Sequence, residues 1–354
     1  MEPDRPLSTR AALRQVMNPP NPWISTVVEH LGPPPEAALE VFFDSSRQAL
    51  SKNDSPDIPF TWSVNPYRGC YHGCAYCYAR PTHQYLDFGA GTDFERKLVV
   101  KREVATLLRD AFEHPRWRGE LVVFSGNTDC YQPLEATWQL TRQCLQVCLA
   151  YRNPVGIITK STLIERDLEL LSELARETFL TVTVSLPFRD ADVARAMEPY
   201  VPTPERRLKT IERLAKAGIA VGINVAPLIP GLNDQDVERV LGDARSAGAV
   251  YANRTMLRLP GPVKEVFEHR LRMLLPLRAD KVMNQIREAR DGQLNESRFG
   301  DRMRGSGPRW RMIDDLFKSA WTRYGYSPMP EPPPLGQVPF RRPERPRAQL
   351  ELFG

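Results

Sequence analysis

The sequence predicts an α/β fold in which buried parallel strands alternate with helices. Apolar runs rich in Val, Ile and Leu recur in the middle of the chain, as is typical of strands buried on both faces. Helical periodicity separates them, and one helical pattern begins at Pro204 and stops before Gly218. Repeated βα units imply either a doubly wound sheet or a barrel. The expected strands are residues 121–125, 155–159, 180–186, 220–226 and 249–257.

Helices are expected between and around these strands, and the ends of the chain are rich in proline. Residues 1–35 and 328–346 hold 16 of the 33 prolines, so we expect disordered ends. Residues 36–54 are expected to form a short amphipathic helix followed by a polar turn, and the other expected helices are residues 164–177, 204–217, 262–275, 279–290 and 310–324. The expected organisation is a proline-rich segment (1–35), a core (36–260), a basic helical extension (261–326) and a linker with a terminal peptide (327–354).

Composition and cysteine spacing favour a cytoplasmic protein without a membrane partner. The 354 residues are 42% hydrophobic and 26% charged, as in ordinary globular proteins. No apolar run approaches the ~20 residues that span a bilayer, and no secretory signal is visible. Three of the six cysteines lie within eight residues, which suits metal binding in a reducing compartment.

Positive charge is concentrated near the carboxyl-terminal third of the chain. The net charge is +5, whereas residues 270–311 alone carry 11 Lys/Arg and 5 Asp/Glu. Arg298, Arg302 and Arg304 alternate with glycines there, and Trp310 follows. Arginine forks bind phosphate and aromatic rings stack on bases, so DNA is one expected partner. The alternatives are a solvated helix face and a plug over the barrel whose arginines pair with internal acids.

Cys70, Cys74 and Cys77 form a C-x3-C-x2-C pattern with a glycine before each of the first two cysteines. Thiolates favour zinc or iron–sulfur centres. A structural zinc site needs a fourth ligand from a second knuckle, for which this sequence offers no clear partner. Three close cysteines suit a four-iron cluster in which one iron is left open to an exogenous ligand.

This pattern, with the aromatic Tyr76 before the last cysteine and βα units downstream, resembles the radical S-adenosylmethionine (SAM) superfamily. The resemblance implies a partial (β/α)6 TIM-like barrel, one [4Fe-4S] cluster, SAM and an external electron donor. It also implies that the reduced cluster cleaves SAM to a 5′-deoxyadenosyl radical, which abstracts hydrogen from a substrate.

The same resemblance implies that residues after successive strands contact SAM, since ligands bind at the carboxyl ends of parallel strands. The alternative for each polar residue there is a turn or a helix cap, and for Glu198 and Arg206 a stiff loop before a helix. The cofactor-binding candidates are Tyr76, Gly126, Asn127, Thr128, Asp129, Lys160, Ser161, Ser185, Glu198 and Arg206.

Within the superfamily, the phrases Asn-Pro-Tyr-Arg-Gly-Cys, Cys-Tyr-Ala-Arg and Ala-Pro-Leu-Ile-Pro-Gly resemble the spore photoproduct lyase-like branch. Its characterised members repair a cross-linked thymine pair in DNA with a cysteine hydrogen donor after the second strand. Gly126 falls where that donor would lie, and Cys130 follows four residues later. Repair of that lesion is therefore not expected. Cys130 is a candidate radical relay or a buried inert thiol.

Gln349, Leu350, Leu352 and Phe353 resemble the bacterial sliding-clamp-binding peptide, here placed after a proline-rich linker. The alternative is a tail that folds back onto the body. Three functions follow: a radical SAM enzyme acting on damaged or modified DNA, a radical SAM enzyme modifying a protein or small molecule, and a non-catalytic iron–sulfur scaffold recruited to the clamp.

Overall fold

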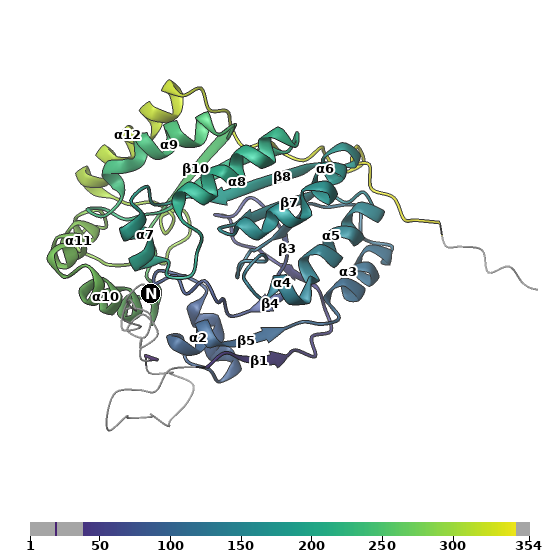
Figure 1. Cartoon of the computed structure of the whole chain (residues 1–354), viewed down its shortest axis with the longest axis horizontal. Coiled ribbons are helices and arrows are strands. Elements are labelled where there is room, and N and C mark those ends of the chain that lie inside the picture. Colours follow the sequence, from purple (N-terminus) through teal and green to yellow (C-terminus); the bar gives the residue numbers. More distant parts are fainter. Residues whose placement is uncertain (1–17, 20–37, 345–354) are drawn as a thin grey trace, which may run out of the picture.

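A computed structural model describes residues 18–19 and 38–344 (Figure 1). Its centre is a sheet of six parallel strands with one antiparallel strand, β2, at its edge, in the order β10-β9-β8-β7-β6-β3-β2. This is the predicted partial (β/α)6 arrangement. The strands are β2 (Leu50–Lys52), β3 (Trp62–Val64), β6 (Val122–Phe124), β7 (Val155–Thr159), β8 (Leu180–Ser185), β9 (Ala220–Leu228) and β10 (Tyr251–Met256).

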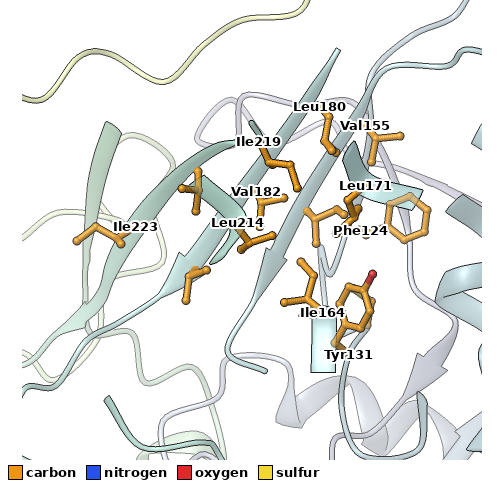
Figure 2. Close-up of a cluster of buried hydrophobic side chains, with 14 of the residues drawn as sticks. Phe124, Tyr131, Val155, Ile164, Leu171, Leu180, Val182, Leu214, Ile219 and Ile223 are labelled. Carbon is orange, nitrogen blue, oxygen red and sulfur yellow. The ribbon is translucent and has the colours of Figure 1, made fainter. Parts of the chain in front are cut away.

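Amphipathic helices cover the outer face of the sheet and close its core. Phe124, Val182 and Ile223 on the strands pack with Leu171 and Leu214 on the helices (Figure 2). Each of these side chains is fully buried, so apolar burial holds the layers together. The helices along this part of the chain are α3 (Val104–Glu113), α4 (Glu135–Trp138), α5 (Leu140–Ala150), η2 (Thr162–Asp167), α6 (Leu168–Glu177), α7 (Ala191–Met197), α8 (Pro204–Lys216), η3 (Asp234–Asp236) and α9 (Val237–Ser246).

Two short strands replace the helix predicted within residues 36–54: β2 at the edge of the central sheet and β1 (Glu40–Phe43) in a second, three-stranded sheet. β1 pairs in parallel with β5 (Lys97–Val100), and β4 (Tyr67–Arg68) pairs with β5 in the antiparallel sense. The helix prediction was wrong because this segment forms two short strands: β1 pairs with β5, which is distant in the sequence, and β2 pairs with the nearby β3. Two short helices, η1 (Arg80–Leu86) and α2 (Thr92–Arg96), lie between β4 and β5.

The helical extension is confirmed as α10 (Val263–Leu274), α11 (Pro276–Glu288) and α12 (Gly307–Arg323), which lie together at one side of the sheet (Figure 1). Buried side chains of α10 and α11, such as Phe267 and Ile286, pack in one cluster with Cys74 and Tyr76. The extension therefore borders the cysteine loop. Within the described part of the chain, no helix is long and apolar enough to cross a membrane.

Residues 327–342, which we call the C-terminal strap, are extended as their prolines predict but lie on the body rather than being disordered. Ser327 N donates to Val250 O at 3.0 Å, beside the start of β10. At the other end, Phe340 stacks on Tyr151, and Arg342 donates to the carbonyl of His114 at 2.9 Å. The strap thus crosses the amino-terminal side of the strands (Figure 1). Residues 1–17, 20–37 and the tail from residue 345 lie outside the described residues.

Candidate active site

The three predicted cluster cysteines lie in a loop between β4 and η1. Cys70 and Cys74 are buried and Cys77 is half-buried. Gly69 and Gly73 have φ angles of +72° and +65°, a region that glycine adopts without strain. A Cβ on Gly69 would lie 2.7 Å from Leu98. The two glycines therefore form the tight turns that bring the cysteines together.

The three thiols of Cys70, Cys74 and Cys77 are a donor set that fits an iron–sulfur cluster. Burial raises the pKa of the Cys74 thiol to about 12, and burial followed by the charge of Asp129 raises the pKa of Cys70. Gly73 N donates to Cys70 O and Cys77 N donates to Cys74 O, each at 3.3 Å, so successive tight turns carry the three thiols. Within the described residues, no three His, Cys, Asp or Glu side chains converge closely enough to hold a single metal ion. A four-iron cluster takes one thiolate per iron, which separated neighbouring thiols can provide. Binding must displace the thiol protons.

Asp129 connects the cysteine loop to the carboxyl ends of β6 and β7. Its Oδ1 accepts a hydrogen bond from Thr159 Oγ1 at 2.7 Å, and its Oδ2 accepts one from Lys160 N at 2.7 Å. His72 Nδ1, from the loop, lies 3.5 Å from Oδ2 and helps to lower the Asp129 pKa. Both carboxylate oxygens are thus engaged by the protein, so Asp129 positions the loop.

Gly126, Asn127 and Thr128 are also brought against the cysteine loop. Tyr78 donates its hydroxyl to Gly126 O at 2.9 Å, and Thr128 Oγ1 donates to Tyr67 O at 2.7 Å. Asn127 N donates to Asn65 Oδ1 at 2.8 Å. A Cβ on Gly126 would lie 2.9 Å from Ser63, so the segment passes close to β3.

Three predicted SAM-binding residues follow β7 and β8. Lys160 lies near the cysteine loop, whereas Ser161 and Ser185 take part in contacts that stabilise the fold. Lys160 Nζ lies 5.8 Å from the ring centroid of Tyr76, and its charge acts on Cys74 and Cys77. Ser161 accepts from Leu163 N at 3.1 Å and caps η2, as the cap alternative predicts. Ser185 is buried, and its carbonyl accepts from Arg207 at 2.8 Å.

Arg207, rather than the predicted Arg206, lies in the interior with Glu198. Arg207 donates to Glu198 Oε2 at 2.7 Å, and Tyr76 donates its hydroxyl to Glu198 Oε1. Arg206 is exposed on α8. The buried positions of this helix include Arg207, Ile211 and Leu214, whose spacing is that of one helix face. The helical spacing in the sequence could therefore have indicated that Arg207, and not Arg206, faces the interior.

Sequence reasoning gave no role to three side chains that contact or adjoin the loop. Gln132 Nε2 donates to Gly69 O at 3.0 Å, and its Oε1 accepts from Tyr71 N at 2.9 Å. Arg80 donates to Cys74 O at 2.7 Å. Arg258, just after β10, lies 5.9 Å from the Tyr78 ring centroid. Arg80 was visible in the Cys-Tyr-Ala-Arg phrase, whereas Arg258 and Gln132 had no motif to reveal them.

Cys130 is placed in the hydrophobic core rather than with the three cluster cysteines. Its side chain packs in the cluster that contains Cys144 and Leu145, and it is fully buried. Burial raises its pKa well above the ordinary value. The surroundings favour the buried inert thiol over the radical relay.

The predicted nucleic-acid residues are partly engaged by acids, as the plug alternative expects. Arg302 Nε lies 2.5 Å from Asp57 Oδ2, on the loop before β3. Arg298 pairs with Glu296 at 3.0 Å, and Arg304 is exposed. The peptide candidates Gln349, Leu350, Leu352 and Phe353 lie outside the described residues.

An open parallel α/β barrel with three cysteines at the carboxyl ends of its strands defines an iron–sulfur enzyme of the barrel type. Residues 64–244, half of the chain, match the family model of the radical SAM superfamily, and the chain belongs to that superfamily. As a member it binds a [4Fe-4S] cluster and SAM, and Cys70, Cys74 and Cys77 are the residues that would hold the iron.

Relatives are known from bacteria and archaea. Uncharacterised proteins of Mycobacterium bovis and Mycobacterium tuberculosis are 40% identical over 224 residues, or 62% of this chain. The match spans 66% of each mycobacterial protein, just under two thirds of its length. An uncharacterised protein of Methanocaldococcus jannaschii is 29% identical over 209 residues, covering 58% of this chain and 74% of its own.

Among solved structures, spore photoproduct lyase complexed with dinucleoside spore photoproduct superposes with a TM-score of 0.59. The superposition covers 81% of this chain and 80% of the lyase, at 14% sequence identity. The same lyase as a mutant with bound AdoMet gives a TM-score of 0.57 at 15% identity, over 81% and 80% of the two chains. These similarities establish a shared fold.

Proposed function

We propose that this radical SAM enzyme acts on damaged or modified DNA. When bound, the cluster and SAM supply a 5′-deoxyadenosyl radical for hydrogen abstraction. The chain's own contribution is to hold the cysteine loop and to bind an anionic substrate at the carboxyl ends of the strands. The observation that carries the proposal is Arg258, a cation beside the loop that forms no salt bridge with any residue the structure describes.

Arg258 is poorly satisfied by the protein. In the described part of the chain it forms no salt bridge, and its Nε is buried without a hydrogen-bond partner. Among residues 18–19 and 38–344, the NH1 group of Arg258 donates only to the Met303 sulfur, at 3.8 Å. Burial, followed by the charge of Arg302, lowers the pKa of Arg258. Binding of an oxyanion such as a phosphodiester stabilises a guanidinium that is desolvated and unpaired in this way.

Aromatic rings lie beside these arginines, as they do in many sites for single-stranded or extruded bases. Tyr78 directly follows Cys77, and its side chain is half-exposed next to Arg258. Phe299 is also exposed, with its ring 4.5 Å from the Arg302 guanidinium carbon. Arg258 and Tyr78 thus offer a phosphate-binding group and a base-stacking ring beside the cluster loop.

The shared fold with spore photoproduct lyase, whose bound ligand is a dinucleoside, supports a nucleic-acid substrate. Gly126 occupies the position expected for the donor cysteine, and Cys130 is buried in the core. We therefore propose a lesion or modification other than spore photoproduct, with a product radical that does not depend on a cysteine donor at this position.

We also propose that Gln349, Leu350, Leu352 and Phe353 bind a bacterial DNA sliding clamp. Arg342 is anchored beside α3, so the chain between it and Phe353 can reach at most ~40 Å. Full-length protein should bind an immobilised clamp, and a Leu352→Ala/Phe353→Ala variant should not. Equal capture of both would exclude the peptide as the binding element.

DNA binding through Arg258 is tested with the reconstituted protein and a fluorescent oligonucleotide. Arg258→Met should weaken binding several-fold and reduce the slope of log affinity against log salt by about 1. Arg323→Met, an exposed arginine at the end of α12, is the control and should behave as wild type. A substrate other than nucleic acid would leave binding weak and identical in all three proteins.

The reaction itself is tested with lesion-bearing DNA and SAM deuterated at the 5′ position. Deuterium that appears in a changed nucleoside would establish that the group formed from SAM exchanges hydrogen with DNA, whereas deuterium confined to 5′-deoxyadenosine would show only that SAM was cleaved. 5′-Deoxyadenosine formation no greater than in a Cys77→Ala control would instead favour the scaffold. Turnover that is stimulated by a protein or metabolite and not by DNA would support the second enzyme class.

A further inference from the structure

We infer that Arg270, in the helical extension, is a positioning residue for the cluster: with Glu95 and Arg80 it fixes the cysteine loop and raises the reduction potential of a bound [4Fe-4S] cluster. The inference concerns the radical SAM centre and is independent of the DNA proposal. It rests on a buried network in which two guanidinium groups and one carboxylate meet directly under the loop.

Arg80 holds the backbone of the second cluster cysteine. Its Nε and NH2 donate to Cys74 O at 3.0 and 2.7 Å. Its NH1 donates to the carbonyls of Ala90 and Gly91, each at 3.0 Å. NH2 also lies 2.5 Å from Glu95 Oε1. Arg80 therefore joins the loop to the start of α2 with every donor group in use.

Arg270 reaches the same carboxylate from the other end of the chain. Its NH2 lies 3.1 Å from Glu95 Oε1, and its NH1 donates to Gly73 O, the residue before Cys74. The side chains of Arg80 and Arg270 are 0% exposed and that of Glu95 is 1% exposed. A Cβ on Gly73 would lie 3.0 Å from Glu95 Oε2, so glycine permits this close approach.

The side chains of Arg80, Arg270 and Glu95 together carry a net charge of +1 within the part of the chain that the structure describes, because two guanidinium charges surround one carboxylate. Charges buried in a medium of low dielectric constant act strongly on their neighbours. Arg80 donates two hydrogen bonds to Cys74 O, so its charge lies beside the backbone of a cluster cysteine. Positive charge near a cluster favours the reduced form, which is the more negative one.

Arg270 belongs to α10, which lies beyond residues 64–244 matched by the family model. The helical extension thus completes the surroundings of a loop located about 200 residues earlier in the chain. Removal of the Arg270 charge changes the net charge from +1 to 0, whereas neutralising Glu95 changes it to +2. The two changes should move the potential in opposite directions.

The test is a redox titration of the reconstituted full chain without SAM, followed by the electron paramagnetic resonance signal of the reduced cluster. At the potential where wild type is half reduced, Arg270→Met should lower the reduced-to-oxidised ratio about tenfold, equivalent to about 59 mV. Glu95→Gln should raise the ratio by a similar factor. Arg270→Lys, which keeps the charge and loses the fork, should remain within about threefold of wild type.

Arg272→Met is the matched control, since Arg272 lies on the same helix but pairs with Glu268 and Asp280 at the surface. It should titrate as wild type. Shifts of opposite sign in Arg270→Met and Glu95→Gln support the inference. Shifts of the same sign, or none larger than that of Arg272→Met, overturn it. If Arg270→Met does not retain iron, Glu95→Gln decides: an increased ratio supports the inference, and an unchanged or decreased one overturns it.

Discussion

Two buried carboxylates hold the residues around the cysteine loop, because both oxygens of each accept hydrogen bonds from the protein. Glu198 accepts from Tyr76 and Arg207, and Asp129 accepts from Thr159 and Lys160 N. A buried carboxylate is costly unless it is paired and hydrogen-bonded. Contact of Glu198 and Asp129 with SAM stays a prediction, and the partners that the structure gives their oxygens are groups of the chain. The two carboxylates fix Tyr76 and the strand ends beside the loop.

Arg207→Met should lower the free energy of unfolding by about 3–5 kcal/mol, because it leaves Glu198 buried without a counter-charge. The measurement is urea denaturation of the wild-type and variant proteins under identical conditions. The double variant Glu198→Gln/Arg207→Met should recover part of the loss, since the unpaired charge is gone. A double variant as unstable as the sum of the two single variants would contradict this explanation.

His83 should make stability depend on pH. It is buried on η1, Lys97 O lies 2.8 Å from its Nε2, and burial lowers its pKa to about 4 from an ordinary value near 6.5. The unfolded chain therefore binds the proton more readily, and stability falls as pH drops from 6.5 towards 4. Neutral His83 therefore makes the free energy of unfolding roughly 3 kcal/mol larger above pH 7 than below pH 4. His83→Gln should lose less stability than wild type between pH 7.5 and 5.0 in urea titrations; an equal loss would assign the dependence to other groups.

At the scale of elements, the cysteine loop depends on turns that only glycine adopts without strain. Gly69→Ala should reduce iron and sulfide content after reconstitution to below half of wild type, because a Cβ there meets Phe94 O at 2.9 Å as well as Leu98. Gly218→Ala is the control. It has a φ of +78°, and in the part of the chain that the structure describes a Cβ there meets nothing within 4 Å. It should cost about 1–2 kcal/mol and keep full iron content. Equal iron loss in both variants would show that backbone strain at positive φ, and not the clash at Gly69, causes the loss.

The central strands were predictable because each carries its own apolar pattern. Residues 155–159 were predicted as a strand and form β7 with the same bounds, buried between β6 and β8. The three cysteines were equally visible, since their spacing is local. The four residues of β1 were not predictable, because they are mostly exposed and their partner β5 is distant in sequence. The buried pair between Glu95 and Arg270 could not be found for the same reason.

Across the whole molecule, the residues after β10 contact both ends of the barrel. α10 provides Arg270 to the cysteine loop at the carboxyl ends of the strands. The C-terminal strap then crosses the opposite side, from Val250 before β10 to Gly119 before β6. The open edge at β10 is thereby linked to α3 and α5 on the far side of the sheet. Neither contact follows from the proline-rich composition, which predicts extended chain but not where it lies.

The C-terminal strap should therefore stabilise the barrel as a whole. Phe340 packs against Phe112 and Tyr151, and its Cβ lies where a Cβ on Gly119 would be only 2.4 Å away. Phe340→Ala should lower the free energy of unfolding by about 1–2 kcal/mol, less than for a fully buried phenylalanine because the ring is half-buried. Leu335→Ala, 60% exposed on the same strap, should change it by less than about 0.5 kcal/mol. Urea denaturation measures both, and equal midpoints for Phe340→Ala and wild type would show that the strap lies on the body without stabilising it.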